Sequence, residues 1–101
     1  MKSFQELTKL RGRNALITGA NGLLGRVFCE TLAELGANLL LVDLPESDFE
    51  TTKSSIINKW DIEVTFLPTD LENQSQRENL ISEIVESNIE LNVLLLWAPQ
   101  I

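Results

Sequence analysis

The feature that most constrains this chain is a regular alternation of short aliphatic runs with longer stretches of helical spacing. Three runs consist almost entirely of aliphatic residues, at 15–18, 39–42 and 93–96. Such runs are typical of strands buried on both faces of a parallel sheet. A further segment, 62–66, alternates apolar and polar residues and predicts a strand that ends near Pro68. The sequence therefore predicts four strands.

Stretches of helical spacing separate these strands. In the first interval, apolar residues recur every three or four positions, at Leu24, Phe28, Leu32 and Leu35. Gly36 follows where a left-handed C-terminal cap is expected. Ser47 and Glu50 have the spacing of a capping box, so we expect the second helix to begin there. Asn73 and Gln76 offer a similar start for a third helix.

The resulting order, β-α-β-α-β-α-β, specifies a parallel sheet with right-handed crossovers. The first three strands should lie side by side, and the third crossover should return past the first strand, which gives the spatial order 3-2-1-4. We therefore predict one α/β domain over 1–101, a partial doubly wound parallel sheet of Rossmann type. Its ligand should bind in the crevice between strands one and four.

Composition excludes several kinds of chemistry. The 101 residues include no His, no Tyr and one Cys, so His-based triads, His metal ligands, a Tyr general acid and an internal disulfide are all excluded. The net charge of −7 disfavours binding to nucleic acid or to anionic membranes. The longest apolar run, 93–98, is far shorter than the roughly 20 residues of a membrane-spanning helix. We expect a cytoplasmic protein in which Cys29 is a buried, inert thiol.

The most informative residues form a glycine-containing turn between the first strand and the first helix. Segment 18–25 reads Thr-Gly-Ala-Asn-Gly-Leu-Leu-Gly. Gly19 would permit the tight turn, Gly22 would let the backbone approach a pyrophosphate, and Gly25 would let the helix pack close to the sheet. The N-terminus of the helix adds free N–H groups and a partial positive charge. The other candidate contact residues of this turn are Asn21, Leu23 and Leu24.

Asp43 ends the second strand, 18 residues after Gly25. An acidic residue about 20 positions beyond the glycine turn is expected to accept hydrogen bonds from an adenosine ribose. A carboxylate there repels a 2′-phosphate, so NAD is favoured over NADP as the cofactor. The alternative is that Asp43 only caps the turn after the strand.

These residues resemble the N-terminal, cofactor-binding portion of the short-chain dehydrogenase/reductase family. The segment 10–19, Leu-Arg-Gly-Arg-Asn-Ala-Leu-Ile-Thr-Gly, is similar to the family's opening strand. Members also carry an Asp and an aliphatic residue after the third strand, which Asp70 and Leu71 match. The resemblance implies that Asp70 binds the adenine amino group and that the backbone of Leu71 flanks the ring. The alternative is that Asp70 only leads into the third helix.

Two features depart from the family's usual pattern. The spacing Thr-Gly-x-x-Gly-x-x-Gly is typical of extended members such as sugar-nucleotide epimerases and dehydratases, whereas classical members have Thr-Gly-x-x-x-Gly-x-Gly. The fourth strand of classical members ends in Asn-Asn-Ala-Gly, but segment 96–99 reads Leu-Trp-Ala-Pro. Ala98 alone matches, and by the resemblance it is the remaining cofactor contact.

Family catalysis uses a Tyr-x-x-x-Lys pair and a Ser beyond the fourth strand. The resemblance therefore implies the NAD-binding portion of an oxidoreductase that transfers hydride between nicotinamide and a carbonyl or alcohol, with the catalytic C-terminal part absent from 1–101. We assign no catalytic residue and expect this chain alone to be inactive. The alternatives are a noncatalytic nucleotide-binding or interaction module, and the N-terminal part of a nucleotide-sugar epimerase or dehydratase.

The predicted topology leaves one sheet face half covered. A helix is about 10 Å wide and strands are about 4.8 Å apart, so one helix covers roughly two strands. Only the third helix would lie on the second face, and the fourth strand would be an open edge. We therefore predict self-association through the exposed face or edge.

Overall fold

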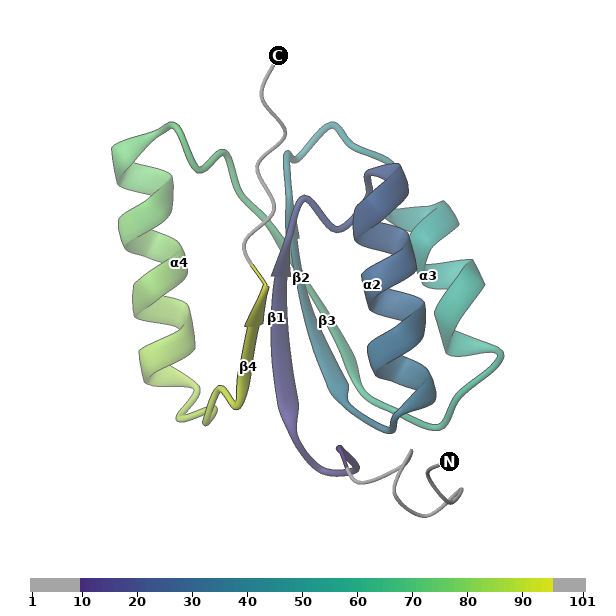
Figure 1. The fold of residues 1–101 in the computed structure, drawn as a ribbon. Helices are drawn as coiled ribbons and strands as arrows, with labels where there is room; N and C mark the ends of the chain where they lie inside the picture. Colours follow the sequence, from purple (N-terminus) through teal and green to yellow (C-terminus); the bar gives the residue numbers. More distant parts are fainter. Residues whose placement is uncertain (1–9, 96–101) are drawn as a thin grey trace.

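The computed structural model describes residues 10–95, and the predicted order of elements is confirmed within them (Figure 1). The elements are β1 (Asn14–Thr18), α2 (Leu23–Glu34), β2 (Asn38–Asp43), α3 (Phe49–Ile57), β3 (Val64–Pro68), α4 (Gln74–Glu86) and β4 (Val93–Leu95). The third strand begins at Val64, so Ile62 precedes it rather than opening it.

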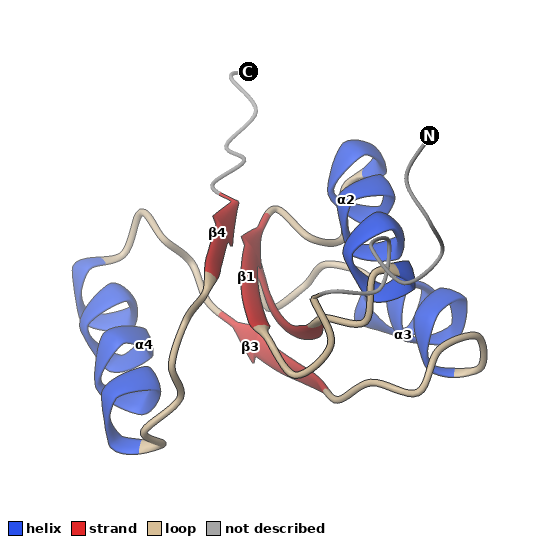
Figure 2. Cartoon of the chain, turned by 60° about the horizontal axis from the view of Figure 1, so that its bottom comes forward, coloured by secondary structure: helices blue, strands red, loops and turns tan. Residues whose placement is uncertain are grey.

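All four described strands are parallel, in the order β3-β2-β1-β4, as predicted. Figures 1 and 2 show the sheet between two helical layers, with α2 and α3 on one face and α4 on the other. The turn from β1 into α2 and the loops that follow β2 and β3 therefore lie together at the carboxyl end of the parallel strands.

Strands β1 and β2 supply core residues to both faces, because successive side chains of a strand point to opposite sides. The core under α2 and α3 includes Ala15, Ile17, Leu39, Leu41, Cys29, Ala33 and Ile56. The core under α4 comprises Leu16, Leu40, Val42, Leu67 and Leu80. The burial of Cys29 raises the pKa of its thiol to about 12, so this side chain stays protonated and inert in the core.

The helix ends match the sequence in two cases and differ in one. Gly36, with φ 95°, follows the C-cap of α2, and the side chain of Asn73 accepts a hydrogen bond from the N–H of Gln76 at the start of α4. The prediction for α3 was wrong by one residue. Asp48, not Ser47, caps this helix, and its carboxylate accepts hydrogen bonds from the side chain and the N–H of Thr51. These hydrogen bonds lower the pKa of Asp48.

Gly25 lets α2 pack directly against the turn that precedes it. A Cβ at this position would overlap the carbonyl oxygen of Gly19 and lie 2.9 Å from the Cα of Ala20. Both neighbours are backbone atoms, which cannot rotate away as a side chain can. The close approach predicted for Gly25 is therefore present, but it is to the turn that follows β1 rather than to a strand of the sheet.

One side of the face under α4 is exposed. Leu80 and Ile84 pack against the sheet, whereas Ile81 and Val85, about 100° further around the helix, are 61% and 70% exposed. Leu94 of β4 is paired with Leu16 and shares its face, yet it is 55% exposed. A hollow of about 400 Å³ also separates part of α4 from Leu40 and Leu67. The predicted half-covered face is present.

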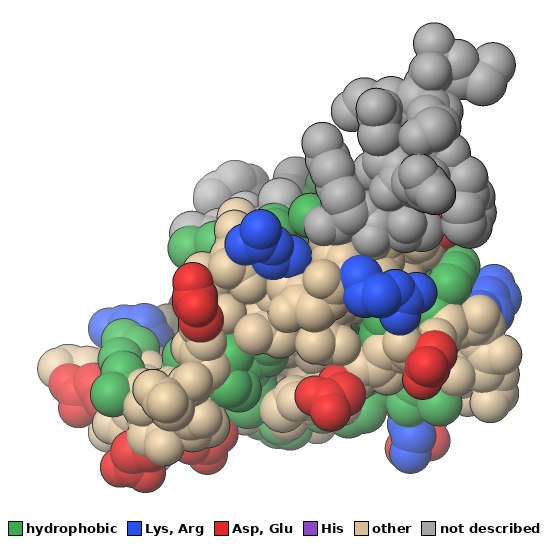
Figure 3. Space-filling view, turned by 90° about the horizontal axis from the view of Figure 1, so that it is seen from below, with side chains coloured by type: hydrophobic (Ala, Val, Ile, Leu, Met, Phe, Trp, Pro, Cys, Tyr) green, Lys and Arg blue, Asp and Glu red, His purple; other side chains and the backbone are tan. Residues whose placement is uncertain are grey.

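The end at which the strands begin carries mixed charges. Seen from below in Figure 3, acidic and basic side chains are interspersed, and the Lys and Arg side chains in view form no continuous patch. This end of the described molecule therefore lacks the clustered basic residues that draw affinity from phosphate backbones.

We expect Gly25→Ala to lower the free energy of unfolding by about 2 kcal/mol, because the added methyl group must displace backbone atoms. Gly22→Ala is the matched control. A Cβ at Gly22 would lie 3.4 Å from the Gly19 oxygen, an ordinary contact, and the φ of Gly22 is −76°. Its change in stability should stay below about 1 kcal/mol. Urea denaturation followed by circular dichroism measures both, and equal losses would contradict the packing role.

We also expect the isolated chain to self-associate through the face that contains Ile81, Val85 and Leu94. Leu94→Gln should shift light-scattering masses toward the monomer and reduce binding of a hydrophobic dye, because it removes exposed apolar surface. Ile57→Gln, on the opposite face and 43% exposed, is the control and should change neither reading. A wild-type chain that stays monomeric at high concentration without binding the dye would contradict this expectation.

Candidate functional site

The glycine turn between β1 and α2 has the backbone conformation that its sequence predicts. Gly19 has φ 67°, in the left-handed region that favours glycine, and its carbonyl accepts a hydrogen bond of 3.1 Å from the N–H of Gly22. Gly22 is the N-cap of α2 and has no side chain to occupy the helix end. Leu23 and Leu24 begin the helix and are 87% and 38% exposed. The N-terminus of α2 is therefore open to a ligand.

The carboxylate of Asp43 joins this turn to the end of β2. One oxygen, Oδ2, accepts a hydrogen bond of 2.8 Å from the backbone N–H of Asn21. The other, Oδ1, accepts one of 2.7 Å from the N–H of Leu44. Both roles considered from the sequence are therefore compatible, since one oxygen caps the local turn and the other faces the glycine turn. A carboxylate has about four lone-pair positions, so capacity remains for ligand hydroxyl groups.

The loop after β3 is held next to Asp43 by a residue that sequence reasoning did not single out. The N–H of Thr69 donates a hydrogen bond of 2.8 Å to the carbonyl oxygen of Asp43, and Thr69 is 6% exposed. Asp70 follows directly. This hydrogen bond joins two backbone groups and continues the β2–β3 pairing by one residue, so no side-chain motif in the sequence predicts it.

Asp70 organises its own loop. Its N–H donates to Oε1 of Gln76 at 2.7 Å, and its Oδ1 accepts from the N–H of Glu72 at 3.0 Å. The carbonyl of Leu71 accepts a hydrogen bond of 2.7 Å from Arg77. The alternative role considered for Asp70, leading into the helix, is therefore present. Its Oδ2 accepts no hydrogen bond from the described residues.

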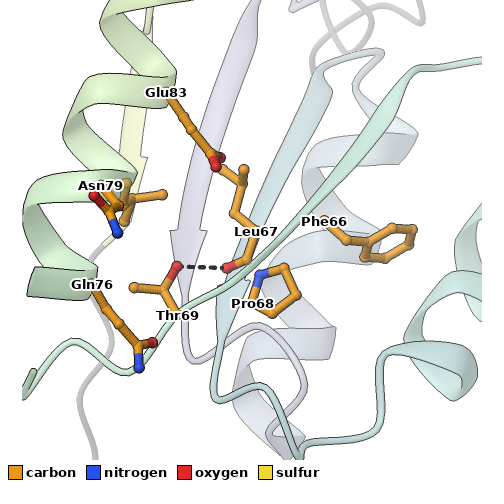
Figure 4. A pocket seen from close by; sticks show the side chains of 8 residues that line it. Phe66, Leu67, Pro68, Thr69, Gln76, Asn79 and Glu83 are labelled. Atoms are coloured by element: carbon orange, nitrogen blue, oxygen red, sulfur yellow. Dashed lines mark hydrogen bonds between the residues drawn. The ribbon is translucent and has the colours of Figure 1, made fainter.

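A hollow of about 390 Å³ lies between the end of β3 and α4 (Figure 4). Thr69 and Leu67 lie on its strand side, and Gln76, Asn79 and Glu83 lie on its helix side. The glycine turn and Asp43 do not line it. This hollow nevertheless adjoins one predicted contact, since Thr69 precedes Asp70 and Gln76 accepts a hydrogen bond from the Asp70 N–H.

Residues 10–95 show neither a metal-binding cluster nor a membrane-spanning helix. They contain no group of three or more His, Cys, Asp or Glu side chains placed to hold a metal ion. None of the helices in this range is long and apolar enough to cross a membrane. Ala98, the last predicted cofactor contact, lies outside the described residues, as do Trp97 and Pro99.

Two curated relatives are similar over most of this chain. A very-long-chain 3-oxoacyl-CoA reductase of Kluyveromyces lactis is 29% identical over 92 residues, which are 91% of this chain and 27% of the relative. A hydroxysteroid dehydrogenase-like protein 1 of Gallus gallus is 26% identical over 90 residues, 89% of this chain and 27% of that protein. The chain thus spans just over a quarter of the length of these relatives.

Solved structures show the same fold. Levodione reductase has a TM-score of 0.75 at 29% identity, over 84% of this chain and 33% of that chain. A short-chain dehydrogenase/reductase from Burkholderia phymatum, solved in complex with NAD, has a TM-score of 0.71 at 32% identity, over 84% of this chain and 30% of that chain. The family model described as short chain dehydrogenase matches residues 13–98. With this match over most of its length, the chain belongs to the short-chain dehydrogenase family.

Proposed function

We propose that this chain is the dinucleotide-binding portion of an NAD-dependent oxidoreductase, which transfers hydride between nicotinamide and a carbonyl or alcohol substrate. Family members use NAD or NADP, and the relatives named above are reductases or dehydrogenases by name. The observation that best supports the proposal is the position of the Asp43 carboxylate. It lies at the end of β2 and accepts a hydrogen bond from the glycine turn that follows β1. In our proposal this carboxylate, which lies beside the open N-terminus of α2, accepts hydrogen bonds from ribose hydroxyl groups.

The residues fit a dinucleotide on structural grounds. Neither backbone conformation nor packing requires a glycine at position 22. Its φ is −76°, which any residue can adopt, and a Cβ there would make only an ordinary contact of 3.4 Å. The missing side chain instead leaves space above the helix end, where a pyrophosphate can reach backbone N–H groups. Gly19 and Gly25 have different tasks, since one needs a positive φ and the other touches backbone.

In this proposal each contact has a distinct task. The backbone between Gly19 and Leu24 holds the pyrophosphate, Asp43 accepts hydrogen bonds from the adenosine ribose, and Asp70 accepts one from the adenine amino group. The backbone of Leu71 flanks the adenine ring. Bound NAD supplies the carbon that accepts hydride.

The cofactor preference follows from charge. The Asp43 carboxylate would repel the 2′-phosphate of NADP, whereas the free 2′-hydroxyl of NAD can donate to it. Among the described residues, two basic ones bond to the residues assigned to the cofactor. The Arg77 side chain donates to the Leu71 carbonyl, and the backbone N–H of Arg26 donates to the Gly22 carbonyl. NAD is therefore the cofactor we propose.

Proton transfer to the substrate oxygen needs a positioned acid or base. The sequence has no His and no Tyr, and Cys29 is buried with its pKa raised to about 12. Because the family's catalytic pair is Tyr-x-x-x-Lys and this sequence has no Tyr, our proposal places the catalytic acid, and the choice of substrate, in residues other than 1–101. A noncatalytic nucleotide-binding module is the competing proposal, and a Tyr-x-x-x-Lys pair downstream in the gene would exclude it.

Asp43→Asn should weaken NAD binding about 10-fold, because a charge-assisted hydrogen bond is worth about 1.5 kcal/mol or more and tenfold in affinity is 1.4 kcal/mol. The ratio of NADP to NAD affinity should rise, since the repelling charge is gone. Calorimetric titration with NAD, NADP and ADP-ribose measures both effects. Asp61→Asn, an exposed carboxylate that follows α3, is the control. Unchanged NAD affinity in Asp43→Asn would remove the assigned role.

Gly22→Ala should leave the fold intact yet weaken ADP-ribose binding by 10-fold or more, roughly the 1.4 kcal/mol of one lost contact. The added methyl group would occupy the space above the helix end that the pyrophosphate needs. Far-ultraviolet circular dichroism confirms folding, and calorimetry gives the affinity. Binding equal to that of wild type would show that the pyrophosphate does not approach Gly22.

A further inference from the structure

Ser47 lies in the loop between β2 and α3, at the centre of a short chain of hydrogen bonds. Its hydroxyl accepts a hydrogen bond of 2.7 Å from Nδ2 of Asn21, 26 residues away in sequence. The same hydroxyl donates one of 2.7 Å to the carbonyl of Leu44, and the Ser47 N–H donates to that carbonyl at 3.0 Å. The serine is thus anchored to its own loop while it holds a side chain of the glycine turn.

Asn21 connects the turn to β2 and to the following loop at once. Its backbone N–H donates to Asp43, and its side chain donates to Ser47. The residue is only 8% exposed, and both bonds are partly buried. Two hydrogen bonds that involve side chains therefore join the glycine turn to the end of β2 and to the loop that follows it.

Ser47 is available for this contact because it does not cap α3. Asp48 does so instead, through its bonds to Thr51. Bonds from Thr51 lower the pKa of Asp48, and the positive charge of Arg26, in the first turn of α2, adds to this effect.

We propose that Ser47 is a positioning residue for dinucleotide binding, which holds the Asn21 side chain and so fixes the glycine turn relative to the Asp43 carboxylate. This inference rests on the proposed function. Ser47 need not touch the ligand. It sets the separation between the site for the pyrophosphate and the site for the ribose before the ligand arrives.

The expected benefit is preorganisation. A dinucleotide contacts both sites as one molecule, so sites that move independently must be ordered during binding, at a cost in affinity. Removing the Asn21–Ser47 hydrogen bond from either side should have the same effect, because each substitution breaks the same contact. The two substitutions together should then cost no more than one of them.

A double-mutant cycle tests this coupling, with NAD as the ligand in calorimetry. Ser47→Ala and Asn21→Ala should each weaken NAD binding about 10-fold, the effect of one lost hydrogen bond. The double variant should also lose about 10-fold rather than about 100-fold. Asn21→Ala keeps the backbone N–H that bonds to Asp43. Ser54→Ala is the control, since Ser54 is exposed on α3 and its hydroxyl makes no hydrogen bond with the described residues.

A rescue variant separates positioning from general stability. Ser47→Thr keeps the hydroxyl and should restore NAD affinity to within about 2-fold of wild type, which follows from retaining the bond. Melting temperatures without ligand show whether a variant is folded at the titration temperature. Should Ser47→Ala fail to fold, Ser47→Cys carries the same test, because a thiol has similar size and is a weaker acceptor.

The outcomes are distinguishable. Wild type that does not bind NAD overturns the proposed function and this inference with it. If wild type binds NAD, any of three results overturns the positioning role alone. These are binding of NAD by Ser47→Ala as tight as that of wild type, losses of the two single variants that multiply in the double variant, and a failure of Ser47→Thr to restore the affinity. Equal, non-additive losses that Ser47→Thr reverses support it.

Discussion

The backbone contact at Gly25 is the constraint on which the candidate site depends. Because α2 touches the carbonyl of Gly19 and the Cα of Ala20, the start of the helix cannot move away from the end of β1. That contact holds the turn tightly, and Asn21 then lies where it reaches both Asp43 and Ser47. A missing methyl group at one position thus determines where the helix N-terminus faces relative to β2.

The order and kind of the elements were predictable because two periodicities, about 2 in strands and 3.6 in helices, are easily told apart. Burial of β1 and β2 on both faces explains why their segments are almost purely aliphatic. Strand order followed from the handedness of crossovers rather than from any single residue. The exposure of an apolar side chain such as Leu94 was also predictable from the topology, since α4 alone is too narrow to cover its whole face of the sheet.

The cap of α3 was not predictable, and the reason is physical. Ser47 and Glu50 have capping-box spacing, but Asp48 and Thr51 have the same spacing one residue later. Local pattern alone cannot rank two overlapping caps of similar strength. In the structure Asp48 is the cap, and Ser47 instead accepts a hydrogen bond from the side chain of Asn21, a residue too distant in sequence for a local pattern to include. The same tertiary contact therefore explains the error and supplies the proposed positioning residue.

Asp43 shows why a single residue type suits its position. Two backbone N–H groups, from Asn21 and Leu44, already bond to its separate oxygens. An asparagine has one acceptor oxygen and one NH₂ group, so it would leave one of these N–H groups facing a donor. A glutamate places its carboxylate one methylene further from the backbone, which displaces it from the N–H of the next residue. Aspartate alone satisfies both donors at short range and keeps lone pairs for a ligand, so turn capping and the proposed ribose recognition call for the same side chain.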